Sequence, residues 1–115
     1  MKPKEISWNK KLHAADVRDA MQEACVDCYG DDEQISGLTT MVDQELAFPF
    51  QGQVLGETVH VVGTSAPLHD PRGIDLVVVH KDKQYAIAAH SVEIPKPLPE
   101  GHLYLAAYLD WKSKQ

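Results

Sequence analysis

The spacing of the apolar residues changes at Phe48-Pro49-Phe50, and this change constrains the fold. Before this segment, apolar side chains recur every three or four residues, which is the spacing of one face of an α-helix. After it, they alternate or run together over short stretches, which is typical of β-strands. Because the residue before a proline disfavours helical geometry, the last N-terminal helix should end here. The sequence therefore predicts helices followed by a sheet.

Two helices are predicted before the change, over about residues 9–28 and 32–46. Gly30 is a natural stop for the first helix. Acidic residues at the start of the second helix suit the positive end of its dipole. The second helix has an apolar stripe and a separate polar face. The stripe comprises Ile35, Leu38, Met41, Val42 and Leu46, and the polar face comprises Ser36, Thr39, Thr40 and Asp43.

Short antiparallel strands are predicted after the change, and together they suggest a small, partly open β-barrel. A turn or two of helix is expected over 102–112. The fold class is α+β, with an N-terminal helical pair packed on the barrel. We expect one domain over 1–115, with residues 9–46 as its helical part and 50–94 as its β part. The expected strands are 51–54, 58–63, 74–80 and 84–89, with a short edge strand at 91–94.

The composition is that of an ordinary globular chain, and its net charge of −6 narrows the partners. Nucleic acids and anionic membranes both require a basic surface, so neither is expected as a partner. A cation or a basic protein fits the sign of the charge. The N-terminus has no apolar signal segment, and no stretch approaches the roughly 20 apolar residues of a transmembrane helix. We therefore expect a cytoplasmic protein with reduced cysteines.

Acidic residues gather between Cys25 and Phe50, with no Lys or Arg among them. Such a group is tolerated either when every carboxylate is solvated or when a cation holds the group together. Calcium prefers six to eight oxygen ligands, chiefly carboxylates and carbonyls. A solvated helix start is the alternative, because the dipole favours acids there. The six acids are Asp27, Asp31, Asp32, Glu33, Asp43 and Glu45.

An EF-hand is excluded by the spacing of these residues. A loop that began at Asp27 would place Tyr29 at an oxygen-ligand position and Leu38 where the bidentate glutamate belongs. Any calcium site in this chain must therefore have another geometry.

The other chemical motifs favour structural roles. Cys25 and Cys28 form a CxxC at the predicted end of a helix, whereas a redox pair sits at a helix start. Two core thiols are the better interpretation, and the six histidines form no metal-binding spacing. No nucleophile elbow, phosphate loop or zinc-protease motif is present, so an enzyme is not expected.

Several segments, in order, resemble the small cyanobacterial calcium-binding protein family of the CcbP type. The resemblance covers residues from about 20 to 111. The resemblance implies a helical pair on an SH3-like barrel, with an acidic, bowl-like pocket between them that binds calcium. The segments are Cys28 to Glu33, Asp43 to Phe50, Val54 to Gly63, Arg72-Gly73-Ile74, Val92-Glu93 and Pro99-Glu100-Gly101.

By this resemblance Asp43 is the residue most expected to bind the metal. Asp31, Asp32, Glu33 and Glu45 would flank it, and Glu57 and Glu93 would contribute from the barrel. The tail departs from the family, because Leu103 and Ala106 stand where the family has glutamates and His102 has entered. This departure predicts weaker calcium binding or a softer metal.

The leading hypothesis is thus a bacterial calcium buffer or sensor without an EF-hand. One alternative is an SH3-like protein-interaction module that binds no metal, with a groove lined by Tyr104, Tyr108 and Trp111. Another is a site for a divalent transition metal that uses histidines.

Overall fold

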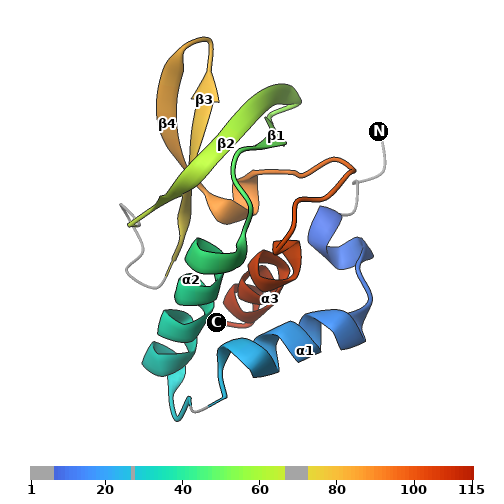
Figure 1. Cartoon of the computed structure of the whole chain (residues 1–115), viewed down its shortest axis with the longest axis vertical. Helices are drawn as coiled ribbons and strands as arrows, with labels where there is room; N and C mark the ends of the chain where they lie inside the picture. Colours follow the sequence, from blue (N-terminus) through green and yellow to red (C-terminus); the bar gives the residue numbers. More distant parts are fainter. Residues whose placement is uncertain (1–6, 27, 67–72) are drawn as a thin grey trace.

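The computed structural model of the chain describes residues 7–26, 28–66 and 73–115. In Figure 1 the sheet lies on one side of the molecule and the long helices lie on the other. The predicted features at Asp27 and Arg72 fall outside the described residues. No helix in the described ranges is both long enough and apolar enough to cross a membrane.

The sheet is an antiparallel meander in the order β1-β2-β3-β4. Its strands are β1 (Phe50–Val54), β2 (Glu57–Ser65), β3 (Asp75–His80) and β4 (Lys83–Ala88), close to the predicted ranges. Two-residue turns join β1 to β2 and β3 to β4, with positive φ at Leu55, Gly56, Lys81 and Asp82. This turn geometry matches the right-handed twist of the strands, so it fixes the register of both hairpins.

A closed SH3-like barrel is not confirmed, because the sheet is open. Strands β1 and β4 lie at its two edges and do not pair with each other. The predicted edge strand at 91–94 is instead a 3-10 turn, η2 (Ala89–Ser91), followed by a single bridge from Glu93 to Gln53. One bridge covers part of the β1 edge but cannot close the sheet.

The predicted first helix is divided into two pieces. Residues Trp8–Lys11 form the 3-10 turn η1, and Ala14–Ala24 form α1. Leu12 between them has extended backbone angles, φ −82° and ψ 157°, which break the helical hydrogen bonding. The second helix, α2 (Asp31–Glu45), agrees with its predicted range within a residue.

The C-terminal helix, α3 (His102–Ser113), matches its predicted range within a residue, but it is one continuous, largely buried helix and not a turn or two. It contacts both α1 and α2 and lies between them in Figure 1, so the helical part is a trio and not a pair. Its apolar run has no polar side over most of its length, which is typical of a central helix. Tyr108 and Trp111 are only 3% and 7% exposed, so they do not line the surface groove expected of an interaction module.

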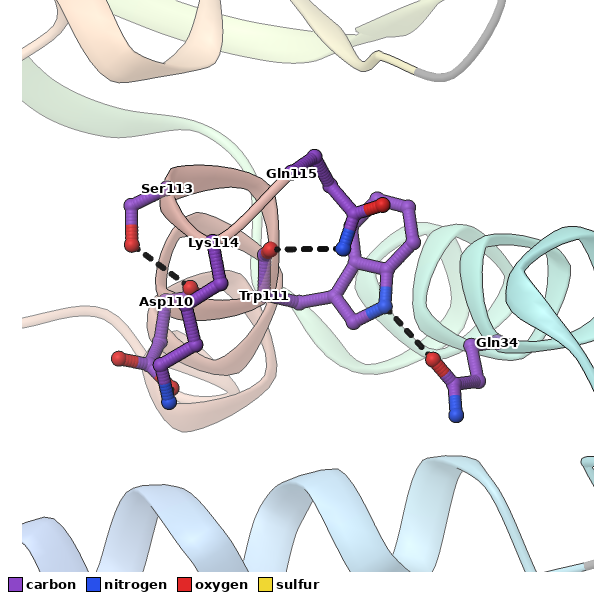
Figure 2. Close-up of polar contacts among 6 residues, drawn as sticks. All are labelled: Gln34, Asp110, Trp111, Ser113, Lys114 and Gln115. Atoms are coloured by element: carbon purple, nitrogen blue, oxygen red, sulfur yellow. Dashed lines mark hydrogen bonds and ion pairs between the residues drawn. The ribbon is translucent and has the colours of Figure 1, made fainter.

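One core joins the helices to the sheet. Its fully buried side chains come from all three parts: Leu38 and Val42 of α2, Val61, Leu76 and Val78 of the sheet, and Leu105 of α3. Two hydrogen bonds fix α3 in place. The Ile74 amide donates to the Tyr108 hydroxyl at 2.8 Å, and Trp111 Nε1 donates to Gln34 Oε1 at 2.8 Å, as Figure 2 shows for the second.

Candidate metal site

A pocket of about 540 Å³ lies where α2 faces the end of β2 and the start of β3. The α2 wall presents the polar face predicted from the sequence. Ser36, Thr39, Thr40 and Asp43 occur at spacings of three, four and seven residues, so they share one side of the helix. The opposite wall consists of Thr64, Ser65 and Ala66, followed by Gly73 and Ile74.

The Asp43 carboxylate is held across this pocket. Thr64 Oγ1 donates a hydrogen bond to Asp43 Oδ1 at 3.0 Å, which joins α2 to β2. The hydroxyls of Thr39 and Thr40 donate to the Ser36 carbonyl at 3.0 and 2.8 Å. Their oxygens keep free acceptor capacity, because a hydroxyl has two lone pairs.

Among its described lining residues, the pocket therefore offers one carboxylate and several hydroxyl oxygens. None of its described lining residues is a lysine or an arginine. Hard oxygen ligands of this kind suit calcium or magnesium better than they suit a transition metal. A site with a single carboxylate is expected to bind such ions weakly.

The acids that begin α2 lie in its first turn. Glu33 Oε2 accepts a hydrogen bond from the Tyr29 amide at 2.8 Å, which satisfies a backbone donor before the helix. Asp31 and Asp32 occupy the same turn, where the helix dipole favours negative charge. None of these three residues lines the Asp43 pocket.

Glu45, at the other end of α2, belongs to a different environment that includes Glu23 and Tyr104. A hydrogen bond between Tyr104 and Glu23 raises the pKa of the Tyr104 hydroxyl above its ordinary value. Burial raises this pKa further, as do the negative charges of Glu23 and Glu45. Both carboxylates therefore lie near the start of α3.

The two predicted ligands from the sheet side have partners of their own. Glu57 lies 3.3 Å from His80 Nε2, across the strands β2 and β3. Glu93 Oε2 accepts a hydrogen bond from the Trp8 amide at 3.0 Å and so ties η1 to the sheet. Neither residue lines the Asp43 pocket.

The predicted acids are thus not gathered into one bowl. Within the described residues, no three His, Cys, Asp or Glu side chains form a group that could hold a metal ion. The same observation gives no support to a histidine site for a transition metal in that part of the chain.

An acidic surface on α1, apart from the Asp43 pocket, was not predicted from the sequence. Asp16, Asp19 and Glu23 line a hollow of about 330 Å³ beside His102 and Tyr104. The three acids are three and seven residues apart and so share a helix face, a pattern that is visible in the sequence. No pattern in the sequence indicates that the Thr64 and Ser65 hydroxyls line the Asp43 pocket, because only the fold brings β2 next to α2.

Cys25 and Cys28 are free thiols at the junction of α1 and α2, and both are half-buried. Cys25 Sγ contacts the Gln34 carbonyl at 3.6 Å, and Cys28 Sγ contacts the Glu33 carbonyl at 3.3 Å. Burial, together with the hydrogen bond and the charge of Cys28, raises the pKa of the Cys25 thiol to about 12. A thiol that holds its proton so firmly is a poor metal ligand or nucleophile.

Comparisons with known proteins give information on the fold. No protein-family model and no curated protein sequence matches the chain. The crystal structure of Anabaena CcbP superposes with a TM-score of 0.70 at 20% identity, over 98% of this chain and 96% of that one. A calcium binding protein in the calcium-binding form superposes with a TM-score of 0.66 at 19% identity, over 95% of this chain and 97% of that one. The chain therefore shares the fold of these two proteins over nearly its whole length.

Proposed function

We propose that this protein binds calcium, as a buffer or sensor, and that the Asp43 pocket holds the ion. The observation that carries the proposal is the Asp43 carboxylate, held by Thr64 at 3.0 Å in a pocket lined with hydroxyl oxygens. The fold supports the proposal, because both superposed proteins have this fold and one of them is named as a calcium binding protein. The chain has no recognisable enzyme motif, which is consistent with a binding role.

The proposed site should have a low affinity for calcium. Calcium affinity rises with the number of charged ligands, and this pocket supplies one carboxylate from the described residues. We expect a Kd of about 10⁻⁴–10⁻³ M, the range of calcium modules that work at high ion concentrations. Calcium should also raise the melting temperature, because an ion that binds only the folded chain stabilises it by mass action.

Calorimetric titration with calcium tests the proposal on the native chain and on Asp43→Asn. The substitution keeps the shape of the side chain and removes its charge, so the binding heat should disappear. Glu57→Gln is the matched control, because it removes a predicted ligand that lies with His80 on the sheet. Its binding heat should be that of the native chain.

Two results would count against the proposal in different ways. No binding heat and no change in melting temperature at millimolar calcium would contradict calcium binding itself. Calcium binding that survives Asp43→Asn but is lost in Glu23→Gln would keep the function and move the site to the acidic face of α1.

A further inference from the structure

A groove of about 610 Å³ runs between α3 and the N-terminal segment formed by η1 and α1. We call it the α1–α3 groove. Its α1 wall includes Val17, Arg18 and Met21, and its α3 wall includes Leu109 and Asp110. It shares no lining residue with the Asp43 pocket. It is a separate surface and needs a separate explanation.

The floor of the α1–α3 groove is apolar. Ala20 is the only buried residue of α1, so the apolar side chains with which this helix lines the groove are incompletely covered. Val17 and Met21 remain half-buried, as does Leu12 at the end of the groove. The apolar lining comprises Leu12, Ala14, Val17 and Met21, with Ala106 and Leu109 from α3.

The rim of the α1–α3 groove is basic, in a chain whose net charge is −6. Lys10, Arg18 and Lys114 line it, and all three are exposed. Among the lining residues that the structure describes, Asp110 is the one acid, and its Oδ2 lies 3.1 Å from Lys114 Nζ. Figure 2 shows this pair at the end of α3. The local charge is thus opposite to that of the whole chain, which selects for a negatively charged ligand.

The geometry points to a protein-binding site for an acidic amphipathic helix of a partner protein. Its apolar side chains, at spacings of three and four residues, would enter the α1–α3 groove between the two helices. Its carboxylates would lie against Lys10, Arg18 and Lys114 on the rim. A recess of this kind accepts protruding side chains, whereas a lipid surface requires apolar groups that protrude from the protein. The inference goes beyond calcium binding and does not depend on it.

The test uses the full chain in EDTA and a labelled synthetic peptide of roughly four helical turns. The peptide has leucines at helical spacing and glutamates on its other faces, and a second peptide has lysines in place of the glutamates. Fluorescence anisotropy should show saturable binding of the acidic peptide alone. The affinity should fall as salt is added, because exposed charges are screened.

Variants locate the binding. Arg18→Glu should weaken it by on the order of tenfold, since it converts attraction into repulsion at the rim. Lys10→Glu should act in the same direction. Met21→Gln should weaken binding because it replaces an apolar side chain in the floor of the groove with a polar one. Lys83→Glu, the same charge change on the distant β4 strand, should leave the affinity unchanged. Circular dichroism and thermal melts confirm that each variant is folded.

Several results would overturn the inference. One is the absence of saturable binding at peptide concentrations of about 1 mM. Another is equal binding of the acidic and basic peptides, or equal effects of Arg18→Glu and Lys83→Glu. A third is binding of the protein to phosphatidylglycerol vesicles, or self-association that Arg18→Glu abolishes, with no binding of the acidic peptide. These last results would assign the groove to a membrane or to a second copy of the chain.

Discussion

The Thr64 hydroxyl donates a hydrogen bond to the Asp43 carboxylate, with 3.0 Å between Oγ1 and Oδ1, and this contact orients the carboxylate of the candidate site. The two residues come from different elements, β2 and α2, and are 21 positions apart in the chain. A carboxylate has two oxygens with about four lone-pair sites, so one hydrogen bond leaves capacity for a cation. The bond therefore orients Asp43 without preventing metal binding.

Thr64→Val should separate the positioning of Asp43 from its charge. The valine keeps the shape of the side chain and removes the donor, so calcium should still bind but with a higher Kd. In EDTA the free energy of unfolding should fall by no more than about 1.5 kcal/mol, the usual size of one hydrogen bond. Calcium-dependent melts of the native chain, Thr64→Val and Asp43→Asn give the comparison. Loss of calcium binding in Thr64→Val with normal binding in Asp43→Asn would contradict this role for the pair.

Gly101 should tolerate no side chain. It directly precedes α3 with φ +84°, and a Cβ there would overlap the carbonyl oxygen of Glu45 at the end of α2. Gly101→Ala should cost about 1–2 kcal/mol for the left-handed backbone and about 1–3 kcal/mol more for overpacking. Gly56→Ala is the matched control, because Gly56 has φ +80° with nothing near the new Cβ. Urea unfolding should show the larger loss for Gly101→Ala, and equal losses would refute the packing argument.

Tyr108→Phe should destabilise the junction between α3 and the sheet. The substitution removes the hydroxyl that accepts a hydrogen bond from the buried Ile74 amide at 2.8 Å. An unsatisfied buried donor costs about 1–3 kcal/mol. Tyr85→Phe is the control, because Tyr85 is 46% exposed and its change should be near zero. A Tyr108→Phe chain as stable as the control would show that water or another group satisfies the amide.

Cys25 should make stability depend on pH in the alkaline range. Burial, together with the hydrogen bond and charge of Cys28, raises the pKa of its thiol to about 12, above the ordinary value of 9.0. A raised folded-state pKa means that the unfolded chain loses its proton first. The contribution is therefore complete below about pH 9 and is lost as the pH rises toward 12.

Urea unfolding across this range, for the native chain and Cys25→Ala, measures the effect. The stability difference between the two chains should narrow as the pH rises. A difference that stays constant would mean that the folded and unfolded thiols have the same pKa. Because Tyr104 also has a raised pKa, both chains should lose some stability in this range, and only their difference reports on Cys25.

The sequence determined the local elements of this protein. The apolar stripe of α2 and its acidic first turn were sufficient to predict that helix, and alternating apolar residues predicted the two hairpins. These features depend on neighbours within a few positions, which is the information that periodicity carries. For α3 the range was predicted within a residue, but its central place was not, because a continuous apolar run has no stripe to indicate which face is buried.

Tertiary structure alone decided three other features. Whether the sheet closed depended on the pairing of residues 91–94, and a single bridge at Glu93 left it open. The family resemblance implied one acidic site, yet Asp43, Glu57 and Glu93 have partners in different parts of the fold. The α1–α3 groove arose because α3 lies between α1 and α2. Each feature joins residues far apart in the chain, and only packing of the common core sets their distance.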